Sequence, residues 1–356
     1  EIDNTNVFIF TPGPDTWAAG PAKGTRSSEE SWVLMPDSTV VTVQTDASGN
    51  AEKYDVASNA WVSAGTLPAN IIENASAEIG PGILLPDGRA FFVGANAGRT
   101  ALYSSGATAT DAGSWSAGPT IPMQPGDANP LGSKDGPGAL LPGGKVLFTA
   151  GPVDGSSGNF LAPSRFFEFD GNALARVSDA PNANCPTYQG RLLPLPNGQV
   201  LWAREDKEEM YAYTNSEAPQ DAWRPVIETC PRQVSPDTVF TLSGQQFNGL
   251  SQAQGYGDDY SAATNYPLVR VRNARSGAVR YCRTSDHSSM GVATGSLTVT
   301  TQVHVPADLE LGFSLLEVVA NGIASTPCRV NVIDHDKGSD QQGLDQQVDR
   351  LVQAAH

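Results

Sequence analysis

The sequence predicts an all-β protein in which several copies of a small antiparallel sheet stack into a propeller, followed by a β-sandwich. Three observations lead to this prediction. A proline turn motif, Met-Pro in its first copy and Leu-Pro in the next three, recurs at intervals of 50, 56 and 54 residues. A tryptophan beside small residues recurs out of phase with it, and the chain contains 36 glycines and 26 prolines. No collagen period accompanies the Gly and Pro, so their abundance indicates many tight turns between short strands.

The turn motif joins the first two strands of each expected sheet. Pro fixes φ and a following Gly accepts φ > 0, and together they favour a tight hairpin. The hairpin prolines are Pro36, Pro86, Pro142 and Pro196, and the apolar runs expected to form the second strands are 39–43, 90–94, 146–148 and 200–202.

A short aromatic strand and a strand ending at a tryptophan complete each repeat. The aromatic segments are 53–55, 102–104 and 167–170, and the tryptophans are Trp17, Trp61, Trp115 and Trp223. A four-stranded sheet of about 50 residues cannot bury both of its faces alone, so it must stack on copies of itself, as a propeller blade does. The regular spacing of the tryptophans predicts that they pack between blades.

These repeats resemble the divergent kelch repeats of the galactose oxidase and glyoxal oxidase family, over roughly residues 5–230. Four full repeats and a leading half-repeat at 7–17 are present, whereas the propellers of this family have seven blades. The resemblance therefore implies a kelch-like β-propeller that is part of a larger ring. Either the chain is a trimmed piece of a longer propeller, or another chain completes the ring.

The pattern of strand-like segments changes after Pro231. Strand-like runs at 238–242, 268–272, 297–301 and 315–320 are separated by turn residues, which is typical of a small sandwich. Residues 231–335 resemble the early-set immunoglobulin-like domain that follows the propeller in galactose oxidase-like proteins. The expected organisation is therefore a propeller region at 1–230, a sandwich at 231–335, and a tail at 336–356 with one short amphipathic helix.

The resemblance also bears on copper. Copper radical oxidases of this family use two tyrosines, one of them thioether-linked to a cysteine, and two histidines. Tyr188 and His287 occupy positions similar to two of these ligands, but Gln189 follows Tyr188 where the family has a histidine. The four histidines are His287, His304, His335 and His356, so residues 1–286 contain none. Because Cu(II) prefers imidazole-rich sites, copper is not expected.

Polar residues stand seven or eight positions before each hairpin proline, where the innermost strand of each sheet is expected to begin. If the repeats align, these residues face a common axis, and His287 approaches from the sandwich. The candidate binding residues are Glu29, Glu78, Asp135, Tyr188, Gln189 and His287. The candidate catalytic residues are Tyr188, His287, Glu78 and Asp135.

Converging carboxylates allow two kinds of chemistry. They could bind a divalent cation such as Ca²⁺ through oxygen ligands. They could also raise one another's pKa and act as an acid–base pair for polysaccharide cleavage. A purely structural alternative is that these polar groups hydrate the channel or tie adjacent blades together, and that His287 docks the two domains. Weaker candidate metal ligands are Tyr188, His287, Asp258 and Asp259.

The cysteines favour an oxidising location, extracellular, periplasmic or at the cell surface. Cys185, Cys230, Cys282 and Cys328 form no Cys-x-x-Cys pair, so zinc is not expected. Three disulfide connectivities are open, and pairing of sequence neighbours (Cys185–Cys230 and Cys282–Cys328) would place one bridge in each half of the chain. Asn74 begins an Asn-x-Ser sequon, a candidate glycosylation site.

The net charge of −16 excludes several partners. Nucleic acid and anionic lipid both need a basic surface, and no run approaches the about 20 apolar residues of a membrane span. The preferred hypothesis is a secreted or cell-surface module that binds a glycan or another protein chain, which includes a chain that would complete the propeller. The alternative is an enzyme acting on carbohydrates or alcohols at the channel mouth.

Overall fold

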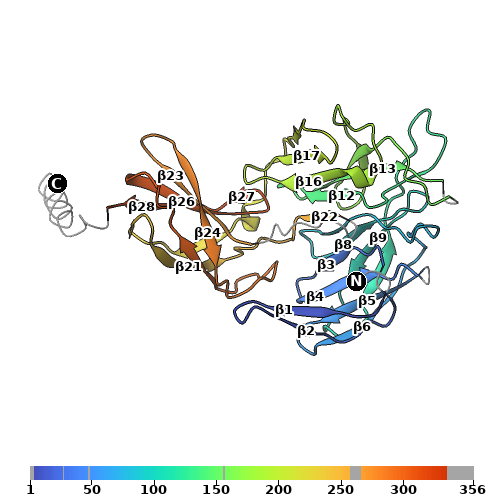
Figure 1. Ribbon diagram of the computed structural model, residues 1–356, viewed down its shortest axis with the longest axis horizontal. Helices are drawn as coiled ribbons and strands as arrows, with labels where there is room; N and C mark the ends of the chain where they lie inside the picture. The colour runs from blue at the N-terminus through green and yellow to red at the C-terminus, as the bar shows by residue number, and fades with distance from the viewer. Residues whose placement is uncertain (1–3, 27, 47–48, 155–156, 257–265, 335–356) are drawn as a thin grey trace, which may run out of the picture.

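The structure, a computed structural model, describes residues 4–26, 28–46, 49–154, 157–256 and 266–334. The prediction of an all-β protein is confirmed: the helical elements of the described chain are two one-turn 3₁₀ helices, η1 (Thr187–Gln189) and η2 (Asp221–Trp223). Figure 1 shows two parts side by side, formed largely by residues 32–213 and 226–332. We call them the four-sheet region and the C-terminal sheet.

Four antiparallel sheets follow one another along the four-sheet region. The first contains β3 (Trp32–Leu34), β4 (Thr39–Val43), β5 (Asn50–Asp55) and β6 (Ala60–Thr66). The second contains β7 (Gly82–Leu84), β8 (Ala90–Val93), β9 (Thr100–Ser104) and β10 (Ser114–Ala117). The third contains β11 (Leu131–Gly132), β12 (Pro137–Leu140), β13 (Val146–Pro152), β14 (Arg165–Phe169) and β15 (Leu174–Arg176). The fourth contains β16 (Gly190–Pro194), β17 (Val200–Arg204) and β18 (Tyr211–Tyr213).

The recurring turn motif forms the hairpins β3–β4, β7–β8, β12–β13 and β16–β17. Gly88, Gly144 and Gly198 have φ of +86°, +92° and +85°, in the left-handed region that a residue without a Cβ adopts at no steric cost. In the first sheet Ser38 takes this place with φ +65°. The turn chemistry therefore sets the length of each hairpin, as the sequence predicts.

Each hydrophobic core of this region lies between two consecutive sheets. One cluster joins the first and second sheets, a second joins the second and third, and a third joins the third and fourth. Alternation along a strand makes this possible: Phe92 belongs to the first cluster, whereas its neighbour Phe91 belongs to the second and stacks on Phe169. Both faces of the second and third sheets are thus covered.

The leading strands of the four sheets contact one another in sequence order, β3 with β7, β7 with β12, and β12 with β16. A segment from the C-terminal part of the chain reaches them. Its strand β22 (Gln254–Tyr256) pairs antiparallel with β12 and also contacts β7 and β16. Val292, from the same part of the chain, is buried in the cluster between the first two sheets. A residue from the C-terminal part of the chain therefore contributes to a core of the four-sheet region.

The C-terminal sheet is one curled sheet wrapped around its own core. Its strands are β19 (Val226–Thr229), β20 (Gln233–Val234), β21 (Val239–Gln245), β23 (Leu268–Asn273), β24 (Val279–Ser285), β25 (Val299–His304), β26 (Gly312–Ala320), β27 (Ile323–Ala324) and β28 (Cys328–Val332). The long strand β24 pairs with β23 in its first half and with β25 in its second. It thereby turns the sheet through the corner that closes the core.

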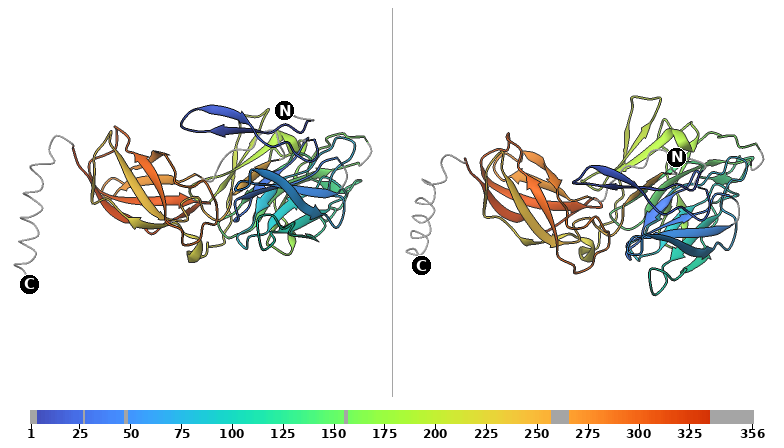
Figure 2. Two further views of the ribbon diagram at one scale, coloured as in Figure 1. Left: turned by 90° about the horizontal axis from the view of Figure 1, so that it is seen from below. Right: turned by 60° about the horizontal axis from the view of Figure 1, so that its bottom comes forward.

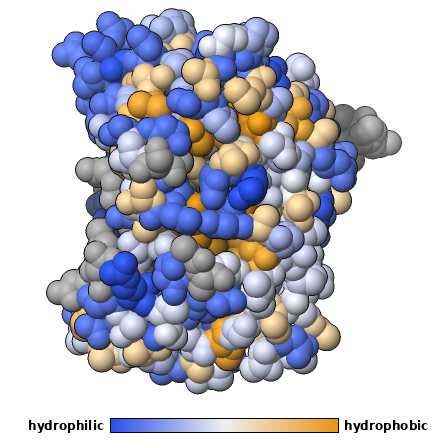
Figure 3. All heavy atoms as spheres, turned by 90° about the vertical axis from the view of Figure 1, so that its right-hand side faces the viewer, coloured by the Kyte–Doolittle hydropathy of each residue, from blue (hydrophilic) through white to orange (hydrophobic). Residues whose placement is uncertain are grey.

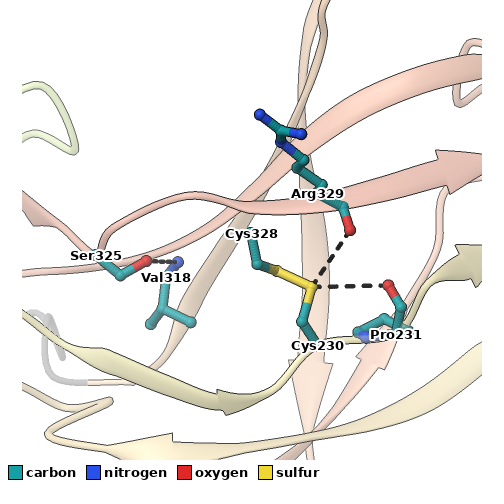
Figure 4. Close-up of a disulfide and its surroundings, with 6 residues drawn as sticks. All are labelled: Cys230, Pro231, Val318, Ser325, Cys328 and Arg329. Carbon is teal, nitrogen blue, oxygen red and sulfur yellow. Dashed lines mark hydrogen bonds between the residues drawn. A yellow bond between two sulfur atoms is a disulfide. The ribbon is translucent and has the colours of Figure 1, made fainter. Parts of the chain in front are cut away.

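The disulfide links Cys230 to Cys328, which are 98 positions apart in sequence and have 6.3 Å between their Cα atoms. Figure 4 shows the bridge between the segment after β19 and the start of β28, where Cys230 Sγ lies 3.7 Å from the carbonyl oxygens of Pro231 and Arg329. Cys185 and Cys282 are buried free thiols. Pairing of sequence neighbours is therefore wrong for both bridges, because the fold brings together cysteines from the two ends of the C-terminal sheet.

The leading half-repeat forms a separate hairpin of β1 (Phe8–Thr11) and β2 (Thr16–Ala19), which projects from the four-sheet region toward the C-terminal sheet (Figure 2). Trp17 on this hairpin is 69% exposed. Packing of the tryptophans between sheets holds for Trp115, whose indole donates a hydrogen bond to the carbonyl of Ala64 in the neighbouring sheet. It is wrong for Trp17, which no second sheet covers, and Trp223 lies on η2 rather than on a strand.

The surface of the four-sheet region mixes hydrophilic and hydrophobic residues. Figure 3 views the end of the four-sheet region, where hydrophilic residues cover most of the face and hydrophobic ones form separate patches. Among the described residues, no helix is long and apolar enough to cross a membrane. Asp258, Asp259 and the tail at 336–356, with its expected helix, lie outside the described residues.

Candidate functional site

Three carboxylates from three different sheets converge. Glu29, Glu78 and Asp135 each place one oxygen so that all three oxygens lie within 4.8 Å of one another. Each residue lies in the segment that leads directly into β3, β7 or β12. We call these three residues the carboxylate cluster. The structure thus brings together three of the four repeat positions that the sequence predicts to share an axis.

Backbone hydrogen bonds hold two members of the cluster in place. Glu78 exchanges both backbone hydrogen bonds with Glu73, at 2.9 and 3.1 Å. The N–H of Asp135 donates to the carbonyl of Ile79, the residue after Glu78, at 3.2 Å. Close approach is possible because Gly80 has no side chain: a Cβ there would lie 2.4 Å from Cβ of Ser133. The second and third sheets are therefore locked together beside the carboxylates.

The environment of Glu78 opposes its ionisation. Burial, then the charge of Asp135 and a hydrogen bond to it, and then the charge of Glu29 raise the pKa of Glu78 from 4.5 to about 10, while Lys134 acts in the opposite direction. Glu78 and Asp135 are each 5% exposed. Oε2 of Glu78 is buried and accepts no hydrogen bond from any residue that the structure describes. Without a bound cation, the cluster holds a proton at neutral pH.

Lys134 lies next to Asp135 in sequence, but its ammonium group is bound elsewhere. Nζ donates to the carbonyls of Gly158 at 2.8 Å and Asn159 at 3.3 Å, and lies 3.5 Å from Glu73 and 4.2 Å from the ring centre of Phe160. Its charge is thus shared with Glu73, outside the cluster. The excess of negative charge around Glu78 is only partly offset.

The fourth repeat position, Tyr188, lies on the one-turn helix η1 and contacts Phe160. The one-turn helix η1 interrupts the segment before β16, and the Tyr188 ring packs edge-on against Phe160 at 5.1 Å. Gln189 ends η1, and its N–H donates to the carbonyl of Pro186. A link to the cluster still exists, because the hydroxyl of Thr187 donates to the carbonyl of Lys134 at 2.5 Å.

His287 is bound within the C-terminal sheet. Its Nδ1 and the hydroxyl of Thr301 on β25 are 2.9 Å apart. Burial lowers the pKa of His287, and the nearby Asp286 partly offsets this effect. Among the described residues, the His287 imidazole does not belong to the carboxylate cluster. The structure thus gives His287 a partner in its own sheet rather than in the carboxylate cluster.

Asn74 is exposed, as a glycosylated residue must be. Its side-chain oxygen accepts a hydrogen bond from Asn70, and the hydroxyl of Ser76, two residues later, donates to Glu73. The sequon therefore lies in the tight turn between the two residues of the Glu73–Glu78 bridge.

Comparison with known proteins gives little beyond this geometry. No protein-family model matches the chain, and no curated protein sequence matches it. Among solved structures, one match is "Crystal structure of putative exo-beta-1,3-galactanase from Bifidobacterium bifidum s17", at 12% identity and a TM-score of 0.27, covering 91% of this chain and 96% of that one. An identity and a TM-score this low assign neither a fold nor an activity to the chain.

Proposed function

We propose that this chain is an extracytoplasmic binding module in which the carboxylate cluster holds a divalent cation. In this proposal residues 1–230 form a kelch-like propeller region and residues 231–335 an early-set immunoglobulin-like sandwich. The surface then presents a glycan- or protein-binding site. The observation that carries the cation proposal is the convergence of Glu29, Glu78 and Asp135 within 4.8 Å.

The order of the sheets supports the propeller. Consecutive sheets pack face to face, and their leading strands contact one another around β22. A propeller places the first strand of every blade at its axis. The exposed hairpin β1–β2, with Phe8 55% and Trp17 69% exposed, supports an assembly role, because it has the strand number of half a blade.

The geometry of the cluster suits a hard cation with oxygen ligands. Ca²⁺–oxygen distances of about 2.3–2.6 Å allow two oxygens on one ion to lie up to about 5 Å apart, and the three oxygens fall within that limit. Oε2 of Glu78, which has no hydrogen-bond partner among the described residues, can coordinate the cation. Water would fill the remaining coordination positions. A cation would favour the ionised form of Glu78 against the burial and the charge repulsion that raise its pKa. It would also tie three sheets together at one point.

Acid–base catalysis by the same carboxylates is less well supported. A polysaccharide would have to reach both carboxyl groups, and both Glu78 and Asp135 are 5% exposed. An ion and a few waters need far less access. The disulfide supports an oxidising compartment, and extracellular calcium modules bind with dissociation constants of about 10⁻⁴ to 10⁻³ M.

Isothermal titration of chelator-treated protein with Ca²⁺, Mg²⁺ and Mn²⁺ tests the proposal. We expect Ca²⁺ to bind at one site and to raise the melting temperature. Glu78→Gln and Asp135→Asn should each weaken binding by at least about 10-fold, since each removes a charged ligand. Glu52→Gln is the matched control. Glu52 on β5 is about as buried as Glu78, but it pairs with Lys23 and lies outside the carboxylate cluster.

Two results would overturn the cation site. One is an absence of binding for all three ions up to about 10 mM, well above the range of extracellular sites. The other is an affinity of Glu78→Gln equal to that of the wild type. If instead the wild type releases reducing ends from a polysaccharide and Glu78→Gln does not, the hydrolytic alternative replaces the proposal.

A further inference from the structure

A pocket of about 320 Å³ opens at the hairpin end of the four-sheet region, beside the segment that leads to the C-terminal sheet. Its walls include Asp87, Gly144, Lys145, Asp170, Glu217 and Trp223. The first four belong to hairpin turns of the second and third sheets, and the last two to the connecting segment. The volume lies at the low end of small-molecule sites, which suits a ligand of one or two rings.

This pocket is separate from the carboxylate cluster. Glu78 and Asp135 come before strands β7 and β12, whereas Asp87 and Gly144 come after the same two strands. The strands therefore run from one site to the other. A ligand in the pocket is held by a different set of residues from a cation in the cluster.

Trp223 provides an aromatic wall whose position is fixed. Its indole ring lies against Gly144, where an added Cβ would be 2.6 Å from Cη2 of the indole. Arg224 anchors the next position, with Nε 2.9 Å from Asp221 and a guanidinium hydrogen bond to the carbonyl of Ala324 in the C-terminal sheet. The indole N–H donates to no residue in the described part of the chain, so it remains available to a ligand.

Charged side chains form the other walls, and the protein already holds them in place. Lys145 lies 2.5 Å from Glu217 and 3.2 Å from Glu168, and these two carboxylates raise the pKa of Lys145. Arg89 joins two turns, because it donates to Asp87 at 2.6 Å and to the carbonyl of Gly171 at 3.0 Å. These contacts exist without a ligand, as in a preformed site.

Asp170 supplies an ionised acceptor. Its Oδ1 accepts the backbone N–H groups of Asn172 at 2.9 Å and Ala173 at 2.7 Å, and these hydrogen bonds lower the pKa of Asp170. Both turn contacts use the same oxygen, and the residue is exposed. The second oxygen can therefore accept hydrogen bonds from a ligand while the first maintains the turn.

Mixed charge selects the class of ligand. An anion meets Asp87, Asp170 and Glu217, and a cation meets Lys145. A neutral ligand with several hydroxyl groups avoids both penalties, since its hydroxyls donate to the carboxylates and accept from Lys145. The C–H face of a sugar ring is apolar and matches the face of an indole, which combines an apolar body with a polar N–H.

We propose that this pocket is a subsite for a neutral saccharide, with the sugar ring against Trp223 and its hydroxyl groups on Asp170, Glu217 and Lys145. The subsite rests on the proposed function in one respect, because it specifies the class of glycan that the proposed binding module would bind. It does not depend on the cation.

Ligand-observed NMR titration tests the subsite with the neutral disaccharides lactose, cellobiose, maltose and laminaribiose, and with glucosamine and galacturonic acid as charged probes. At least one neutral disaccharide should bind, with a dissociation constant in the millimolar range or tighter. Trp223→Ala and Asp170→Asn should each weaken that binding by at least about 10-fold. Trp17→Ala is the matched control, because that indole is exposed and lies outside the pocket.

Several results would overturn the subsite. These are no binding of any neutral disaccharide up to about 50 mM, wild-type affinity in both Trp223→Ala and Asp170→Asn, or binding of a charged probe alone. Melting curves show whether Trp223→Ala still folds. If Trp223→Ala does not fold, Asp170→Asn carries the test, because its side-chain oxygen still accepts the hydrogen bonds of the turn. Saccharide binding should persist in chelator and in Glu78→Gln. Failure of the cation site and failure of the subsite are therefore observed separately.

Discussion

The backbone N–H of Leu34, on the leading strand of the first sheet, donates a 2.9 Å hydrogen bond to Oε1 of Gln252. The two residues are 218 positions apart. Gln252 lies just before β22, the strand that pairs with β12 of the third sheet. One short segment thus binds two sheets of the four-sheet region. Because it also connects β21 to β23, the two parts of the molecule should unfold together.

Val292 gives the first test of this coupling. Its side chain is 2% exposed within the cluster between the first and second sheets, against which Trp115 also packs. Val292→Ala should lower the free energy of unfolding by about 1–3 kcal/mol, because it leaves a cavity in that core. Denaturant unfolding followed by tryptophan fluorescence measures the loss. Leu297→Ala nearby, at a 58% exposed position, should change stability little, and equal losses in both variants would contradict the assignment.

Glu78 predicts a dependence of stability on pH in the cation-free protein. Its pKa is about 10 in the folded state against 4.5 as a free carboxyl group, with Asp135, Glu29 and Lys134 as the charged groups facing it. The folded protein therefore retains a proton that the unfolded chain releases above pH 4.5. This contribution is full below that pH and is lost as the pH rises toward about 10.

Melting curves in chelator between pH 5 and 9 measure this effect. The wild type should lose stability as the pH rises more steeply than Glu78→Gln, which cannot ionise at this position. Since glutamine resembles the protonated carboxyl group, the variant should fold well at low pH. Parallel pH profiles for the two proteins would show that Glu78 does not carry the proton.

The disulfide predicts a count of thiols and a loss of stability. Unreduced, denatured protein should titrate with two free thiols, those of Cys185 and Cys282, and a peptide pair containing Cys230 and Cys328 should appear in a non-reducing digest. Replacing Cys230 and Cys328 together by serine should cost about 2–5 kcal/mol, because the bridge closes a long loop in the unfolded chain. A digest that yields a Cys185–Cys230 peptide instead would refute this pairing.

Gly190 should not tolerate a side chain. A Cβ at this position would lie 1.9 Å from Cη2 of Trp202, and that indole is fully buried with its N–H bonded to Asn182 at 2.7 Å. Gly190→Ala should therefore destabilise the fold by about 1–3 kcal/mol or more through overpacking. Gly291→Ala provides the comparison, because its nearest atom is the flexible Ser289 hydroxyl at 3.2 Å. Thermal melts of the two variants should differ clearly.

The sequence predicts local features of this fold well. The run 39–43 is strand β4 with the same bounds, and the expected turns fall where the motif places them, because Pro and Gly act on their immediate neighbours. Contacts between residues that are distant in the chain are harder to predict from the sequence. Neither the pairing of β22 with β12 nor the Cys230–Cys328 bridge has a local signal, since both depend on how the two parts pack.

The candidate site divides in the same way. Glu29, Glu78 and Asp135 hold equivalent places in their repeats, so repeat geometry alone brings them together. Tyr188 has the same offset, but it lies on the one-turn helix η1, which the repeat pattern does not predict. Trp223 shows the opposite problem. Its spacing matches that of the packing tryptophans, and only the fold reveals that it lines a pocket.

The position of the disulfide has a mechanical consequence. Cys230 stands where the chain passes into the C-terminal sheet, and Cys328 begins β28, the last described strand. A pulling force applied across the two ends of the protein would pass through the covalent bridge and leave the chain between the cysteines unloaded. Under tension in an oxidising environment, the four-sheet region would extend while most of the C-terminal sheet kept its shape.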